Sequence, residues 1–217
     1  MADIDKQDSS GAEDFSRQFS VSRETVERLE VYAEILRKWQ PRINLVGSKT
    51  LQQLWNRHFA DSAQIVNHIP DDAVTLADLG SGAGFPGLVV KALRPAIDVT
   101  LIEADTRKAA FLTQAAAAMS LPVTVLPRRI EDTAKTLNFT GYSVITARAL
   151  APLPELLTLA HPFANDRSLF LFLKGQNVES ELLSAAKYWT MDVQQIASQT
   201  HQDGRLLKIT RLCRVDI

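Results

Sequence analysis

Short apolar runs alternate with amphipathic stretches from residue 74 to the end of the chain. The apolar runs, often β-branched, predict buried strands, and they lie near residues 74–77, 99–102, 123–126, 143–147 and 169–173. Helical spacing predicts helices between them, near residues 88–94, 106–119 and 178–187 and from Pro152 onward. Two closing strands are predicted near residues 192–197 and 206–213. This order predicts an α/β fold with a mostly parallel twisted sheet, helices on both faces and an antiparallel edge hairpin.

The chain before residue 71 has a different pattern, which predicts an N-terminal helical cap at residues 21–70. A helix begins at Ser22 and keeps helical spacing to Trp39, before Pro41 ends it. Thr50 is predicted to cap a second helix that runs to about Asn67. Residues 1–20 are polar and acidic and are predicted to form a disordered tail. Residues 71–217 then form the main domain.

Length and composition narrow the class of protein. The 217 residues, 46% of them hydrophobic, allow one substantial domain with an appendage. No apolar run reaches the roughly 18 residues of a membrane span, and the acidic N-terminus is unlike a signal peptide. The single cysteine, Cys213, fits a reducing compartment, and four scattered histidines show no metal-ligand spacing. We expect a cytoplasmic monomer that neither spans a membrane nor holds a metal.

Charge is distributed unevenly, although the formal net charge is only −1. Residues 1–34 carry 9 acidic and 4 basic side chains, whereas residues 35–217 carry 16 acidic and 20 basic ones. No acid lies between Glu34 and Asp61, in a window that holds two tryptophans and Arg37, Lys38, Arg42, Lys49, Arg57 and His58. Basic residues interleaved with aromatics suit an RNA surface. The alternative is a solvated helix face with two core tryptophans.

A glycine-rich turn joins the first strand to the helix after it. It reads Asp78-Leu79-Gly80-Ser81-Gly82-Ala83-Gly84-Phe85-Pro86-Gly87. Glycines let the backbone pass close to a ligand, and a helix start offers unpaired N–H groups. The next strand ends in Glu103, where a carboxylate can accept both hydroxyls of a ribose. The pattern predicts a nucleoside-cofactor site.

Two cofactors fit such a site. Gly82-x-Gly84-x-x-Gly87 matches the dinucleotide fingerprint of nicotinamide enzymes literally. The order Asp-x-Gly-x-Gly-x-Gly that begins at Asp78 instead resembles the first motif of Rossmann-like methyltransferases that use S-adenosylmethionine. The cationic sulfonium and amino group of that cofactor would favour Asp78. A nicotinamide oxidoreductase should also have a separate substrate domain, but only about 70 residues precede the sheet.

Functional groups end or follow successive predicted strands. In order they are Asp78 and Gly80, Glu103, Ile130 and Glu131, Arg148, and Lys174. Ligands of open parallel sheets bind beyond the carboxyl ends of the strands. The coincidence of these groups at one edge is stronger evidence for a site than any single motif.

Several stretches resemble one family, the bacterial methyltransferases that place a methyl on N7 of a guanine in 16S ribosomal RNA, also called the glucose-inhibited division protein B family. The stretches cover about residues 25–175 in the family's order: Asn44-Leu45-Val46, Arg57-His58-x-x-Asp61-Ser62, Gly80 to Gly87, Lys108-x-x-Phe111-Leu112, Arg129-x-Glu131, Ala147-Arg148-Ala149 and Lys174-Gly175. The resemblance implies a methyltransferase fold behind a helical cap, with S-adenosylmethionine contacts at Gly80, Phe85, Ile130, Glu131 and Arg148.

Roles for the cofactor residues follow from both lines of argument. Asp78, Gly80, Gly82 and Glu103 would hold the cofactor, with Glu103 on the ribose. Phe85 and Ile130 would flank the adenine, and Glu131 would lie near its amino group. Phe85 and Ile130 could instead be core residues, and Glu131 a solvated acid.

RNA contacts are predicted at Arg42, Asn44, Lys49, Arg57, His58, Arg107, Lys108 and Lys174. Arg107 and Lys108 stand at a predicted helix start, where cations oppose the macrodipole, so a ligand or RNA role explains them better than chance. The alternative for His58 is a histidine whose hydrogen bonds are satisfied at an interface within the protein.

The predicted reaction is methyl transfer to guanine N7 in the 530 loop of 16S ribosomal RNA within the small subunit. N7 carries a free lone pair, so no general base is needed, and we predict that Arg148 positions the reactants. The alternative for Arg148 is an ion pair with Asp132 or Glu155. The alternatives for the protein are a methyltransferase of a small metabolite and a nicotinamide-dependent oxidoreductase.

Overall fold

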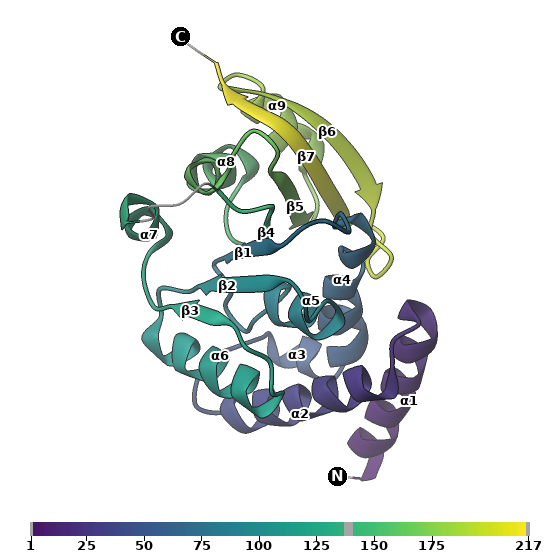
Figure 1. Ribbon diagram of the computed structural model, residues 1–217. Helices are drawn as coiled ribbons and strands as arrows, with labels where there is room; N and C mark the ends of the chain where they lie inside the picture. The colour runs from purple at the N-terminus through teal and green to yellow at the C-terminus, as the bar shows by residue number, and fades with distance from the viewer. Residues whose placement is uncertain (1, 137–140, 216–217) are drawn as a thin grey trace.

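The sheet confirms the predicted Rossmann-like α/β class. The computed structural model describes residues 2–136 and 141–215, with side chains from residue 11. Residues 1 and 217, the outer bounds of the predicted domains, lie outside the described residues. The strands pair in the order β3-β2-β1-β4-β5-β7-β6 (Figure 1). Their bounds are β1 Thr75–Leu79, β2 Asp98–Ile102, β3 Thr124–Leu126, β4 Val144–Arg148, β5 Leu169–Lys174, β6 Trp189–Ala197 and β7 Arg205–Arg214.

Strand direction and order define where a ligand can bind. Strands β1 to β5 pair in parallel, whereas β7 is antiparallel to both β5 and β6, as the predicted edge hairpin requires. The chain runs outward from β1 through β2 to β3 and then returns to β4 on the other side of β1. The sheet therefore has its topological switch point between β1 and β4.

Alternation along the strands sends side chains into two hydrophobic clusters. On β5, Leu169, Leu171 and Leu173 belong to one cluster and Phe170 and Phe172 to the other. Such a strand is buried on both faces, which is why it reads as a continuous apolar run. Figure 1 shows helices on both faces. They are α5 Gly87–Leu93 and α6 Thr106–Ala118 against the first cluster, and α7 Ile130–Thr136, α8 Leu153–Ala160, η3 His161–Phe163 and α9 Val178–Ala185 against the second.

The first cap helix agrees with its prediction. Helix α2 spans Arg23–Trp39, and the hydroxyl of Ser22 accepts a hydrogen bond from the Thr25 N–H at 3.2 Å. Its apolar face carries Leu29, Tyr32 and Leu36 into the same hydrophobic cluster as α5 and α6. The cap therefore packs directly on one face of the sheet domain.

The second cap helix was predicted to be continuous, and this prediction is wrong. The segment is broken into α3 Ser48–Leu51, the π-helix η1 Trp55–Ala60, α4 Asp61–Ala63 and the 3-10 helix η2 Val66–His68. Gly47 rather than Thr50 precedes its first turn, and the Thr50 hydroxyl donates to the Gly47 carbonyl at 2.9 Å. The wider π turn buries Trp55 and Phe59, whose rings are 4.9 Å apart. Tertiary packing outweighs regular helical periodicity here.

The predicted disordered tail is also wrong, because residues Ala2–Phe19 form helix α1. Phe15 is only 2% exposed, and its ring lies 4.9 Å from that of Phe19 and 5.5 Å from that of Trp55. Gly11 lets the helix approach Trp55, since a Cβ there would lie 2.9 Å from that side chain. The acidic composition of this stretch predicted disorder. Phe15 and Phe19, one turn apart, nevertheless give the helix a hydrophobic face.

Candidate functional site

A cavity of about 500 Å³ opens beside the switch point, at the carboxyl ends of β1, β2 and β4. Seven of the eight predicted cofactor residues line it: Gly80, Gly82, Phe85, Glu103, Ile130, Glu131 and Arg148. Its volume suits a small organic ligand. We call it the cofactor cavity. The remaining lining residues are Leu45, Ser81, Ala83, Ile102, Ala104, Lys108, Arg128, Arg129, Ala149, Leu150, Ala151, Glu155 and Leu159.

The glycine turn is held from outside by the cap. The hydroxyl of Tyr32 on α2 donates to the carbonyl of Ala83, and its ring stacks on Phe85 with centroids 5.4 Å apart. Gly84 has φ +88°, and a Cβ there would lie 2.6 Å from the Tyr32 hydroxyl. The sequence places Tyr32 on an apolar helix face but cannot show that it contacts this turn.

Glu103 is 9% exposed and anchors the turn from inside the cavity. One carboxylate oxygen accepts the Gly82 N–H at 2.8 Å, and the other accepts the Asp105 N–H at 2.8 Å. Each carboxylate oxygen has a second lone pair. Glu103 can therefore hold the backbone and still accept hydroxyl groups of a ligand.

Asp78 lies beneath the glycine turn, fully buried, and is not among the residues that line the cofactor cavity. Its carboxylate accepts the Thr146 hydroxyl at 2.8 Å and the Gly87 N–H at 3.2 Å. A Cβ on Gly87 would lie 2.8 Å from the Asp78 carboxylate, so this approach requires glycine. Burial raises the pKa of Asp78 to about 6, against the opposing effect of these hydrogen bonds. Asp78 therefore supports the glycine turn from below and does not line the cofactor cavity.

Arg148, at the end of β4, is bound by the cap. Its guanidinium donates to the Asp61 carboxylate at 3.3 Å, to the Arg57 carbonyl at 3.4 Å and to His58 Nδ1 at 3.0 Å. It also lies 4.8 Å from the centre of the Phe85 ring. Both Arg57 and Asp61 belong to the Arg-His-x-x-Asp motif of the cap, so the geometry explains that spacing.

The alternative partners predicted for Arg148 are wrong. Asp132 instead pairs with Lys135 at 3.3 Å, and Glu155 is an exposed residue of the cofactor cavity. Asp61 was the missed partner. The sequence offers a signal in the Asp61 position of the motif, but it offers Arg57, four residues earlier on the same predicted helix, as an equally simple partner for that acid.

His58 is neutral and fixed in one tautomer. Because arginine only donates, His58 Nδ1 accepts from Arg148, so Nε2 carries the proton and donates to the Thr50 hydroxyl at 2.9 Å. Burial, with the charges of Arg148 and Arg57, lowers the pKa of His58 to about 3. Its ring stacks on Phe85 with centroids 5.0 Å apart. His58 therefore orients Arg148 and Phe85 through contacts that need the uncharged ring.

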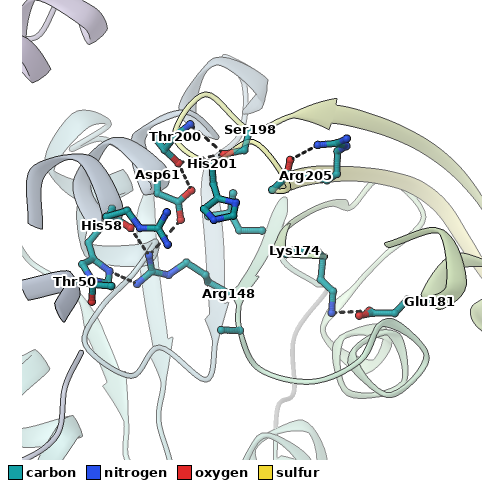
Figure 2. Close-up of a pocket in the computed structure, with 15 residues that line it drawn as sticks. Thr50, His58, Asp61, Arg148, Lys174, Glu181, Ser198, Thr200, His201 and Arg205 are labelled. Carbon is teal, nitrogen blue, oxygen red and sulfur yellow. Dashed lines mark hydrogen bonds and ion pairs between the residues drawn. The ribbon is translucent and has the colours of Figure 1, made fainter. Parts of the chain in front are cut away.

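A second cavity, of about 420 Å³, lies on the other side of Arg148. We call it the outer cavity. Cap residues, the ends of β4 and β5 and the β6–β7 turn surround it (Figure 2). It shares Arg148 and Ala149 with the cofactor cavity. The other lining residues are Thr50, Arg57, His58, Asp61, Leu173, Lys174, Gly175, Glu181, Ser198, Thr200, His201, Gly204 and Arg205.

The eight predicted RNA residues divide into three groups. Arg57, His58 and Lys174 line the outer cavity, and Lys108 lines the cofactor cavity. Lys174 is engaged, with its amino group 2.7 Å from the Glu181 carboxylate and donating to the Ala151 carbonyl at 2.8 Å. The others are exposed and line neither cavity: Arg42, Asn44, Lys49 and Arg107.

The cations at the start of α6 have a local partner. Asp105 caps this helix and accepts the N–H groups of Arg107 at 2.8 Å and Lys108 at 3.3 Å. These hydrogen bonds lower the pKa of Asp105. An acidic cap offsets the unfavourable placement of the cations, which weakens the argument that they need a ligand.

Two negative findings concern residues 2–136 and 141–215 alone. No helix there is long and apolar enough to cross a membrane. No group of three or more His, Cys, Asp or Glu side chains there could hold a metal ion.

The arrangement is that of a two-substrate site. One cavity has the Glu103 carboxylate beside a glycine turn, the other has cations beside two paired acids, and the fixed Arg148 stands at their junction. Two molecules bound in the two cavities would meet beside Arg148, which suits a reaction governed by proximity and orientation.

Comparisons with known proteins give one consistent result. The sequence model of the family described as rRNA small subunit methyltransferase G matches residues 25–207. The chain is 47% identical over 204 residues to the ribosomal RNA small subunit methyltransferase G of Paramagnetospirillum magneticum, covering 94% of this chain and 97% of that relative. It is 46% identical over 202 residues to the protein of the same name from Rhodospirillum rubrum, covering 93% and 98%.

Among solved structures, the ribosomal protein L11 methylase from Lactobacillus delbrueckii subsp. bulgaricus superposes with a TM-score of 0.59 at 15% identity, covering 79% of this chain and 82% of that one. This likeness shows a shared fold.

Proposed function

The chain belongs to the rRNA small subunit methyltransferase G family, and from that premise we propose that it transfers a methyl group from S-adenosylmethionine to N7 of a guanine in the 530 loop of 16S ribosomal RNA. It would act as a cytoplasmic monomer on the small ribosomal subunit. The observation that carries the proposal is the junction of the two cavities at Arg148.

The cofactor cavity fits S-adenosylmethionine. Glu103 would accept the ribose hydroxyls, Ile130 would contact an adenine face, and Glu131 would accept its amino group. Phe85 is only 3% exposed and its ring stacks on Tyr32 and His58, so it would act as a core residue that holds these neighbours rather than as a cover for the adenine. Gly80 and Gly82, at φ +63° and +57°, bring the backbone to the cavity wall. When bound, this cofactor supplies an electrophilic methyl group on a cationic sulfur. Asp78 would act indirectly, by fixing the turn from below.

The side chains at the junction favour a nucleophile that needs no deprotonation. Guanine N7 has a free lone pair. The nearest histidine, His58, has a pKa of about 3 and its Nδ1 lone pair is engaged by Arg148, so it is a poor general base at neutral pH. Arg148 cannot lose its proton. Its guanidinium is instead suited to hold guanine O6 or a phosphate beside the methyl group.

An RNA base has to leave its stack to reach such a junction, and loop nucleotides are the cheapest to extract. The outer cavity would receive that nucleotide. Arg42, Asn44 and Lys49 are exposed on the cap and would contact the surrounding RNA backbone.

The test is methyl transfer to small subunits from cells that lack this protein. With tritiated S-adenosylmethionine we expect one methyl group per subunit, mapped by mass spectrometry to a 530-loop guanine. Thermal protection by S-adenosylmethionine but not by NADH is the accompanying control. Protection by NADH alone would favour the oxidoreductase, and turnover with a metabolite but not with subunits would favour the small-molecule methyltransferase.

A further inference from the structure

We propose that the β6–β7 turn, residues 198–204, and the start of β7 form the wall of the outer cavity that receives the target nucleotide, with the His201 imidazole stacking on the extruded base and Arg205 contacting its phosphate. The inference rests on the proposed function and extends it to a part of the chain for which the sequence predicted no RNA contact.

The turn is held in place by the same carboxylate that binds Arg148. Asp61 pairs with Arg148 through one oxygen and accepts the Thr200 hydroxyl at 2.7 Å through the other. Gln64 accepts the Gln199 N–H at 3.0 Å and so ties the turn to α4. Figure 2 shows Thr200, Asp61 and Arg148 joined in one line of contacts. The turn is thus positioned relative to the junction before any RNA arrives.

His201 presents an aromatic ring to this cavity. Figure 2 shows its imidazole reaching from the turn toward Arg148. The residue is exposed and lines the outer cavity. Its Nδ1 accepts the Asp203 N–H at 3.2 Å, which fixes the ring without covering its faces. Exposed aromatic faces beside cations are how proteins hold unstacked bases.

Charge in the outer cavity favours a phosphate. Both of its carboxylates are neutralised, Asp61 by Arg148 and Glu181 by Lys174. Within the described residues, Arg57 and Arg205 have no carboxylate partner within 4.0 Å. Arg205 donates to the carbonyls of Gln202 and Gly204 through one guanidinium nitrogen, at 3.1 and 2.8 Å. The rest of its planar fork remains available to a phosphate.

Two substitutions at His201 separate base stacking from support of the turn. His201→Phe keeps an aromatic face but loses the acceptor for Asp203. His201→Asn keeps an acceptor at a similar position but loses the ring. If the ring stacks on the base, His201→Asn lowers kcat/KM for small subunits about tenfold, whereas His201→Phe stays within about twofold of the wild type. The affinity for S-adenosylmethionine, measured by calorimetry, is unchanged in both.

Arg205→Gln is the second arm, with Arg214→Gln, an exposed arginine near the far end of β7, as its control. We expect Arg205→Gln alone to raise KM for subunits and to reduce the salt slope of subunit binding by about one. The reverse order at His201, with Asn active and Phe impaired, would overturn the inference, as would wild-type kinetics in all three turn variants. Failure of the wild type to methylate subunits would instead overturn the proposed function, and the inference with it.

Discussion

The cofactor cavity and the outer cavity touch at Arg148 but are built differently. The cofactor cavity is lined mainly by consecutive strand ends and the loops that follow them, between residues 80 and 159. The outer cavity combines cap residues 50–61, the ends of β4 and β5 and the turn at residues 198–205. A cavity built from strand ends can be inferred from motifs, whereas one assembled from three distant segments depends on how they pack.

The acids of the two cavities also act differently. Glu103 accepts backbone N–H groups and so fixes the shape of the glycine turn. Asp61 and Glu181 neutralise Arg148 and Lys174. The cofactor cavity is therefore held by hydrogen bonds to the backbone, and the outer cavity by ion pairs across segments. Substitutions that address one support at a time can test this distinction.

Arg148 belongs to both cavities, so its loss has the largest expected effect. Arg148→Ala leaves Asp61 and His58 without their shared donor and should slow single-turnover methylation by about a hundredfold or more. Because the proposed nucleophile, guanine N7, needs no general base, the rate should remain nearly flat from pH 6.5 to pH 9, a range chosen to bracket histidine titration.

The matched control is His58→Ala, which should leave the pH profile flat because His58, with a pKa of about 3, is neutral throughout that range. A wild-type rate that rose tenfold per pH unit through neutrality would contradict the proposal. It would indicate a nucleophile that has to lose a proton first.

Glu103 supports the cofactor cavity alone. Glu103→Ala removes the acceptor for two backbone N–H groups and, by proposal, for the ribose, so S-adenosylmethionine binding should weaken by about 1.5–3 kcal/mol. Calorimetric titration measures this directly. Binding of small subunits without cofactor should stay at the wild-type level, and an equal loss of both affinities would mean that the two cavities do not have separate supports.

Asp78 lies under the cofactor cavity, and its effect should appear in stability. Its folded pKa of about 6 exceeds the unfolded value of 3.8, so the folded state binds more protons and loses stability as pH rises through this window. Asp78→Asn removes that loss. Relative to the wild type, the variant should gain on the order of 2 kcal/mol in unfolding free energy between pH 4.5 and pH 6.5.

Urea denaturation at the two pH values provides the measurement for Asp78→Asn. The sign is specific to a raised carboxyl pKa. A carboxylate whose folded pKa was depressed would give the opposite change, because the wild type would then gain stability as pH rises.

The exposed cap cations lie outside both cavities and should have the smallest effect. Arg42→Glu or Lys49→Glu should weaken binding of small subunits and reduce its salt slope by about one phosphate contact each. Arg23→Glu, on α2 beside Glu27, is the control. Wild-type methylation rates in both cap variants would indicate that the acid-free stretch between Glu34 and Asp61 is a solvated helix face rather than an RNA surface.

The sheet, the glycine turn and most of the cofactor cavity could be predicted from the order of residues along the chain. Gly82, Glu103 and Arg148 each end or follow a strand, and parallel strands bring their carboxyl ends to one edge of a sheet. Their proximity therefore follows from topology once the strands are recognised. The start of α2 at Ser22 and the closing hairpin could also be predicted. Both depend on residues that are near in sequence or joined by one turn.

Contacts between distant segments could not be predicted in this way, because they depend on how the folded elements pack. Tyr32 reaches the glycine turn, Asp61 joins Arg148 to Thr200, and His201 faces the outer cavity. Phe15 orders α1 by packing on Trp55, in a stretch whose composition predicted disorder. Each contact depends on how two packed elements are placed relative to each other. Local periodicity shows which face of an element is buried but not which residue of another element that face contacts. Packing of the cap against the sheet, rather than any local motif, therefore made the outer half of the site.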